Sequence, residues 1–214
     1  MHKFVAALRA SRLENCFNPY ADCCRVHDLA EAPRIRAAML SDLVEQAESR
    51  DVDAIWIGRD LGYRGGRRTG LALTDDFHFS RHLERWGIES SRPTAGPLLA
   101  ERTASIVWEL LNQIPEDIFL WNVFPFHPHD AGQPFSNRQH SRSERRIGED
   151  ILAHLIEVLR PSRIIAIGND AAEVAARHSK RLPMTGVRHP SYGGQTVFRR
   201  QVQDLYALRQ PTLF

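Results

Sequence analysis

The segment 58–70, GRDLGYRGGRRTG, places one carboxylate, Asp60, among glycines and arginines. It follows the apolar run 53–58, which predicts a short buried strand. The glycines leave the loop free to turn backbone N–H groups towards an anion. A carboxylate here could orient a water molecule or stabilise a developing positive charge. An aspartate that only caps the loop is the competing interpretation.

Asn122 and His189 are two further polar side chains near expected strand ends. Asn122 lies in the apolar run LWNVF, and its amide offers the donor and acceptor that match the Watson–Crick edge of a pyrimidine. His189 precedes Pro190, which favours an extended or turn backbone, and its ring could donate a hydrogen bond to an oxyanion. Taken singly, each residue could instead be structural.

Two other segments could bind a metal. His127 and His129 are one residue apart and precede Asp130, so both rings could face one side of an extended segment, although the proline between them indicates a loop. The second segment has C-x6-C-C-x2-H spacing, which fits no known metal pattern, and we expect its thiols to be free. Its residues are Cys16, Cys23, Cys24 and His27.

Apolar runs alternate along the chain with stretches of helical periodicity, which predicts right-handed crossovers and a parallel sheet. Ser141 and Glu144 have the spacing of a capping box at the start of one helix. Ligands of parallel sheets bind beyond the carboxyl ends of the strands, so the polar strand-end residues should share one cleft. We expect strands over 53–58, 118–124, 163–168 and 184–190, and helices over 31–50, 97–114, 141–160, 169–177 and about 197–209.

Together these segments resemble the uracil-DNA glycosylase superfamily. Residues 58–71, GRDLGYRGGRRTGL, are similar to the motif GQDPYHGPGQAHGL of its uracil-specific branch, including the acid that activates water. LWN, 120–122, is similar to the strand motif that ends in a uracil-reading asparagine, and residues 189–191 are similar to its late His-Pro-Ser motif. NVFPFHPHDAGQPFSNRQHSRSER and RIIAIGNDA resemble segments of the bacterial and archaeal branches. The resemblance covers about residues 53–200. It implies a three-layer α/β fold with a central four-stranded parallel sheet flanked by helices.

The resemblance also implies hydrolysis of the N-glycosidic bond of a base that has left the DNA stack. Asp60 would orient water and stabilise the cationic sugar, and a neutral His189 would hydrogen-bond the departing base. The base-binding residues would be Asn122, Gly62, Tyr63, Leu73 and Phe77. The DNA-binding residues would be Arg59, Arg64, Arg67, Arg68, Arg142, Arg188, Ser191 and Tyr192, with Tyr192 as the wedge. No cofactor is implied, and three cysteines are one too few for the iron–sulfur branches.

Two positions depart from the uracil-specific pattern. Gly62 stands where that branch has a tyrosine that excludes the methyl group of thymine, so the base range should widen to hypoxanthine or xanthine unless Tyr63 fills the space. Leu73 aligns with the phenylalanine that stacks on the base, and Phe77, Phe79 or Phe124 could supply the ring instead.

Length and composition are those of one globular domain. The chain has 214 residues, 43% hydrophobic and 25% charged, and residues 1–50 should form a helical extension packed on the domain. The N-terminus does not resemble a secretory signal and no apolar run approaches the roughly 20 residues of a membrane span. We expect a cytoplasmic monomer that contacts no membrane.

The net charge of +2 says little about DNA, but the arginines gather near the expected strand ends. All but two of the 28 basic residues are arginines, which fits a cleft that binds phosphates. The expected partner is DNA containing uracil or another deaminated base. Two alternatives stay open: a metal-dependent hydrolase or nuclease built on His127, His129 and Asp130, and a binder of uracil-containing DNA that has no catalytic activity.

Overall fold

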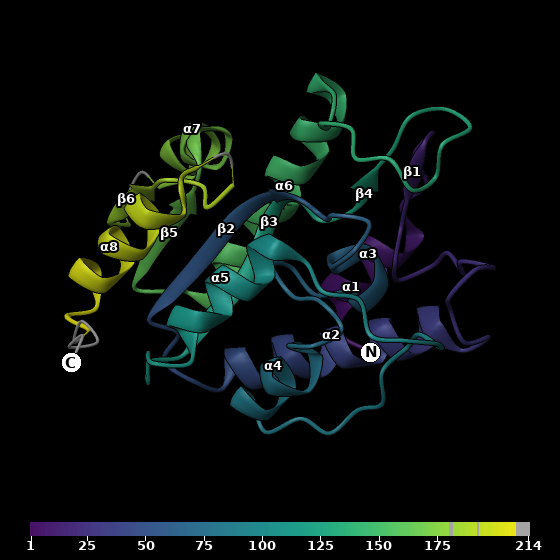
Figure 1. The fold of residues 1–214 in the computed structure, drawn as a ribbon, viewed down its shortest axis with the longest axis horizontal. Helices are drawn as coiled ribbons and strands as arrows, with labels where there is room; N and C mark the ends of the chain where they lie inside the picture. Colours follow the sequence, from purple (N-terminus) through teal and green to yellow (C-terminus); the bar gives the residue numbers. More distant parts are fainter. Residues whose placement is uncertain (180–181, 192, 209–214) are drawn as a thin grey trace.

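The computed structural model describes residues 1–179, 182–191 and 193–208, and a parallel four-stranded sheet lies at its centre (Figure 1). The strand order is β3-β2-β5-β6. The strands are β2 (Ala54–Asp60), β3 (Ile118–Phe124), β5 (Arg163–Ile167) and β6 (Met184–Val187). Register pairs Gly58 of β2 with Asn122 of β3, so the polar ends of these two strands lie side by side.

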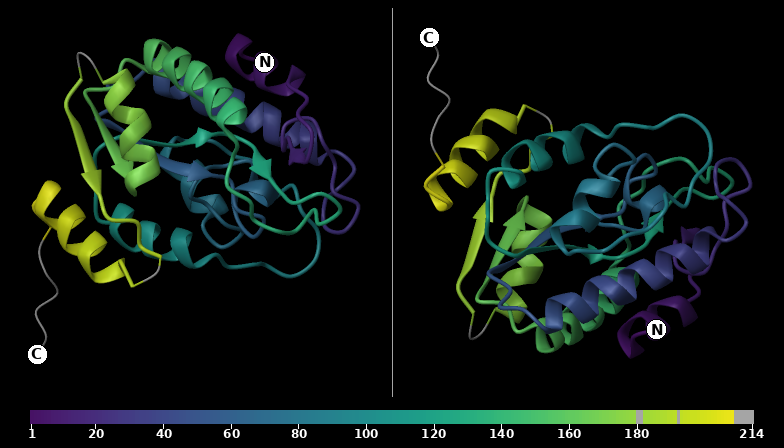
Figure 2. Two further views of the ribbon diagram at one scale, coloured as in Figure 1. Left: turned by 90° about the horizontal axis from the view of Figure 1, so that it is seen from above. Right: turned by 90° about the horizontal axis from the view of Figure 1, so that it is seen from below.

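Helices cover both faces of the sheet, as Figure 2 shows. One face packs against α1 (Lys3–Ala10), α2 (Ala32–Glu48), α4 (Phe79–Arg85), α6 (Arg142–Leu159) and α7 (Asn169–His178). The other face packs against α5 (Arg102–Leu111) and α8 (Gln195–Leu205). This arrangement confirms the expected three-layer α/β fold.

β3 is buried along its whole length, and β2 and β5 are mostly apolar and buried except at one end, as expected for parallel strands covered on both faces. Along β2, Ile55 and Ile57 join the core beneath α2 and α6, whereas Ala54 and Trp56 join the core beneath α5 and α8. The side chain of Asn122 falls in the second set by the same alternation along β3. The candidate site is therefore on the α5 side of the sheet.

The predicted elements are present with changed bounds at several ends. The capping box at the start of α6 is confirmed, because the Ser141 hydroxyl accepts from the Glu144 N–H and the Glu144 carboxylate accepts from the Ser141 N–H. The N-cap of α7 is Gly168, with φ of 90°. Periodicity did not indicate α1, α4, the short α3 (Gly66–Thr69), or the antiparallel pair β1 (Cys16–Phe17) and β4 (His127–Pro128).

The N-terminal residues contribute to the core. Phe4, Val5 and Leu8 of α1 are buried in the same cluster as the inner face of α2. The three cysteines are free thiols, as expected. Within the described residues, no helix is long and apolar enough to span a membrane.

Candidate active site

A cleft of about 400 Å³ opens at the carboxyl ends of β2, β3 and β5 and beside the segment after β6. Asp60, Asn122 and His189 all line it, although the first and the last are 129 positions apart in the sequence. The structure thus brings together the three residues that sequence assigned to catalysis and base reading.

Asp60 ends β2 and is held on both carboxylate oxygens. Arg59 Nε donates to Oδ2 at 2.7 Å, and Nδ1 of His140 contacts Oδ1. Nε2 of His140 lies 3.2 Å from Arg145 Nε, and an arginine can only donate, so Nε2 is the acceptor and Nδ1 carries the proton given to Asp60. The Asp60 side chain is only 6% exposed, and these contacts leave it one orientation.

His140 is a site residue that the sequence analysis missed. It precedes the N-cap of α6, and its side chain is buried between α6 and the end of β2. Nothing in its local sequence separates it from a loop histidine. Its proximity to Asp60 depends on how α6 packs against β3.

His189 is arranged to donate a hydrogen bond into the cleft. The Ser191 N–H donates to its Nδ1 at 3.1 Å, so in the neutral ring Nε2 carries the proton. Burial lowers the pKa of His189, and the positive charges of Arg59 and Arg188 lower it further. A neutral ring that donates through Nε2 is the form that the resemblance required.

Asn122 is buried in the cleft wall without hydrogen-bond partners. Its side chain is 1% exposed, and among the described residues nothing bonds either Nδ2 or Oδ1. A Cβ at Gly58 would overlap Oδ1, which explains a glycine at that position of a buried strand. Leaving a buried amide unpaired costs about 1–3 kcal/mol, so a ligand that pairs with it would recover this energy.

Glu101 fills the space beside Gly62 and was also missed. Its Oε1 would lie 3.2 Å from a Cβ at Gly62, and its Oε2 would overlap a Cβ at Gly65. Burial raises the pKa of Glu101 to about 7, and the nearby Asp75 raises it as well. At the position where the uracil-specific branch has a tyrosine, this chain has Gly62, and the Glu101 carboxyl lies beside it.

Of the other residues expected to bind the base, some line the cleft and some do not. Leu73 lines the cleft with φ of 53°, and Trp108 Nε1 donates to its carbonyl oxygen at 3.1 Å. Phe77 is 57% exposed and is not among the residues lining the cleft. Tyr63 does not line the cleft either, and its hydroxyl accepts from Arg64 Nε at 2.7 Å. The alternative rings of Phe79 and Phe124 are buried in the core.

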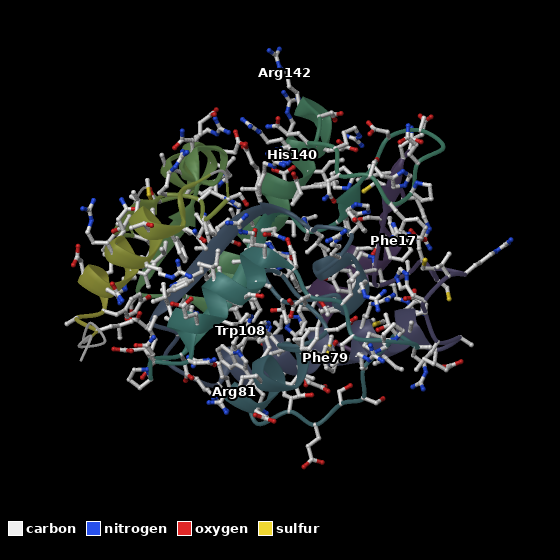
Figure 3. All side chains as sticks on the ribbon, viewed as in Figure 1. Phe17, Phe79, Arg81, Trp108, His140 and Arg142 are labelled. Atoms are coloured by element: carbon white, nitrogen blue, oxygen red, sulfur yellow. The ribbon has the colours of Figure 1, made fainter. Side chains whose placement is uncertain are left out.

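Of the arginines expected to bind DNA, four lie in the cleft or on the surface and two are buried. Arg59 and Arg188 line the cleft, Arg64 is exposed, and Arg142 extends outward from the first turn of α6 (Figure 3). Ser191 also lines the cleft, whereas Tyr192 lies outside the described residues.

The burial of Arg67 and Arg68 argues against the expectation that they contact DNA. Arg67 is 3% exposed, and its guanidinium lies 3.7 Å from the ring centre of Phe17. Arg68 forms an ion pair with Asp76 at 2.7 Å. Both side chains make their contacts inside the fold, and neither lines the cleft that holds Asp60.

The histidine segment that suggested a metal site is also used inside the fold. His127 is fully buried, with Arg67 Nη1 3.1 Å from its Nδ1 and the Ser136 carbonyl oxygen 2.9 Å from its Nε2. Both ring nitrogens are therefore engaged. No group of three metal-ligating side chains occurs in the part of the chain that the structure describes.

Comparison with known proteins identifies the family and a similar fold. The family model for the uracil DNA glycosylase superfamily matches residues 47–211. The crystal structure of wild-type Pedobacter heparinus SMUG2 is similar at a TM-score of 0.62 and 14% identity, over 97% of this chain and 99% of that chain. No curated protein matches the sequence. Because the family model spans well over half of the chain, the protein belongs to the uracil DNA glycosylase superfamily.

Proposed function

We propose that this protein is a monofunctional DNA glycosylase that hydrolyses the N-glycosidic bond of uracil and of deaminated purines in DNA. The observation that carries the proposal is the unpartnered amide of Asn122 in a cleft that also holds Asp60 and His189. An amide donor beside an amide acceptor is complementary to the O=C–N–H edge that deamination creates in a base. All three residues come from one chain, so the proposal needs no second copy.

The reaction begins when the target nucleotide leaves the duplex and its base enters the cleft. Asn122 pairs with the base edge, while Nε2–H of His189 hydrogen-bonds the base oxygen on which negative charge develops. The bond from C1′ to the base nitrogen breaks, and its electron pair leaves with the base. The negative charge of Asp60 stabilises the oxocarbenium-like sugar.

Asp60 then directs the water. Each of its oxygens already accepts one hydrogen bond from the protein, from Arg59 or from His140, and each retains a lone pair. A water bound to one of them adds to C1′ and gives its proton to the carboxylate, and this proton then passes through water to the departed base anion, which becomes the neutral base. The products are the free base and an abasic sugar in an unbroken strand, and no step requires a metal ion.

The test compares wild-type protein with the Asp60→Asn variant. Wild-type protein should make oligonucleotides that contain uracil, hypoxanthine or xanthine sensitive to alkali, and EDTA should not inhibit it. Asn at position 60 cannot take the proton, so base release should fall by at least about a hundredfold while binding persists. Arg81→Gln, on the distant α4, is the control variant.

Each alternative function predicts a different outcome. Inhibition by EDTA together with strand cutting before alkali would favour the nuclease. Binding by the wild-type protein without release of any base would favour the non-catalytic binder. Either outcome would overturn the proposed function.

A further inference from the structure

Glu101 is a titratable group in the cleft that the proposed mechanism does not use. It is the residue before α5, and its backbone N–H donates to Asp75 Oδ2 at 2.7 Å. Its carboxyl group lies over Gly62 and Gly65, where it would overlap a Cβ at Gly65 and lie 3.2 Å from a Cβ at Gly62. No hydrogen bond or ion pair to this carboxyl is present among the described residues, so it is free to meet a ligand.

The position of Glu101 matters because of the base edge that would face it. When an amide pairs with N3–H and O4 of uracil, C5–H lies beside O4 and offers no hydrogen bond. When the same amide pairs with N1–H and O6 of hypoxanthine or xanthine, N7 lies beside O6 instead. N7 is an acceptor, and Glu101 lines the same cleft as Asn122, with its carboxyl group beside Gly62.

We propose that the carboxyl group of Glu101, in its neutral form, donates a hydrogen bond to N7 of a deaminated purine and so determines the protein's preference for purines over uracil. The inference rests on the proposed function. Glu101 contacts the base and not the reacting C1′. It withdraws electrons from the departing purine through N7 and gains nothing from a pyrimidine.

The surroundings of Glu101 favour the neutral form of its carboxyl group below about pH 7. Burial raises its pKa to about 7, and Asp75 adds to that rise from the segment before α4. The Asp75 carboxyl is also 2.6 Å from Nδ1 of His78. Above about pH 7, an ionised Glu101 would repel the N7 lone pair. The other charged or titratable groups around the cleft are Arg59, Asp60, Arg138, Asp170, Arg188 and His189.

The first experiment measures single-turnover excision of hypoxanthine and uracil from matched oligonucleotides at saturating protein. Glu101→Ala should reduce the hypoxanthine rate by about tenfold relative to the uracil rate, the effect of one hydrogen bond. Glu101→Gln keeps a donor that does not titrate. The hypoxanthine-to-uracil ratio should therefore fall above about pH 7 in wild type and stay flat in Glu101→Gln. Glu109→Gln, on the outer side of α5 and paired with Arg199, is the matched control.

A second experiment removes the partner atom from the base. In an Asp60→Asn background, oligonucleotides with hypoxanthine should bind about tenfold more tightly than those with 7-deazahypoxanthine, which has C–H in place of N7. Adding Glu101→Ala should abolish the difference. Thermal melting of each variant checks that it folds.

The outcomes separate the inference from the function on which it rests. Equal losses on hypoxanthine and uracil in Glu101→Ala, or equal binding of hypoxanthine and its 7-deaza analogue, would overturn the role of Glu101 while leaving glycosylase activity intact. Failure of the wild-type protein to release any base would overturn the proposed function itself. The binding comparison would still report whether Glu101 contacts N7.

Discussion

The polar side chains of the cleft differ in how fully the protein satisfies them. Asp60 has a donor on each oxygen, and His189 has one ring nitrogen engaged by Ser191. Asn122 and the Glu101 carboxyl have no partners among the described residues. Groups already satisfied are fixed for chemistry, whereas groups left unpaired are available for recognition.

The unpaired amide should make the native protein less stable than it could be. Replacing Asn122 with leucine keeps a similar shape and removes two buried unsatisfied atoms, so the free energy of unfolding should rise by about 1 kcal/mol. Base excision should be lost in the same protein. Thermal unfolding measures the first effect and the alkali assay the second. A destabilised Asn122→Leu protein would instead mean that the amide supports the fold.

The cationic surroundings of His189 should set the acid limb of activity. Protonation would break the bond from the Ser191 N–H to Nδ1, so excision should fall as pH drops through the pKa of His189. Arg188→Gln removes a charge that lowers this pKa, and the acid limb should therefore move to higher pH. Single-turnover rates at saturating protein over about pH 5 to 8 measure the shift. Arg200→Gln, which is exposed on α8, should leave the limb in place.

Only some of the residues that line the candidate site could be identified from the sequence. Asp60, Asn122 and His189 were identifiable because each belongs to a short motif beside a strand end, and their roles stay predictions. His140 and Glu101 carry no such motif, since they reach the cleft only through helix packing. The sequence also did not show that Arg67 and Arg68, which it placed beside Asp60, are buried.

Elements position the site through a few close approaches. Gly148 of α6 lies so near β3 that a Cβ there would overlap the Val123 carbonyl oxygen. This contact lets α6 begin beside the end of β2, where His140 meets Asp60. The orientation of Asp60 therefore depends on a helix that supplies none of the three proposed reacting groups.

Gly148→Ala should test this dependence. Alanine is favoured over glycine in a helix by about 1 kcal/mol, yet here the Cβ must displace α6 from β3. We expect a net loss of stability and slower excision. Gly186→Ala is the control, because its Cβ would sit at an ordinary 3.5 Å from Ala172. Unchanged melting and excision in Gly148→Ala would contradict this account of the packing.

The elements themselves were largely predictable. The apolar strands and the capping box of α6 are strong local signals, and the structure contains them. Strand order, the β1–β4 pair and the α4 segment were not predicted, since each depends on contacts between residues far apart in sequence.

The net charge of the whole molecule is only +2, but its arginines are unevenly placed between the surface and the interior. Arg142 extends from the end of the molecule that holds His140, whereas Arg81 of α4 lies at the opposite end (Figure 3). Buried arginines such as Arg68 are neutralised within the fold. Arg59 and Arg188, which are exposed and line the cleft, are available to meet phosphates there.

The salt dependence of DNA binding should distinguish these two ends. Each phosphate contact contributes about one unit to the slope of log affinity against log salt. Arg142→Gln should lower the slope by about one, and Arg81→Gln should leave it unchanged. Equal effects of the two variants would mean that binding is not confined to the cleft side.

The most direct test of the account is the mass of a uracil-containing oligonucleotide after incubation with the protein and before any alkali. Hydrolysis at C1′ predicts an unbroken strand that has lost one base, together with free uracil in solution. The Asp60→Asn protein should leave the strand unchanged. A strand cut at a phosphodiester, or one that keeps its base in the presence of the wild-type protein, would contradict the account.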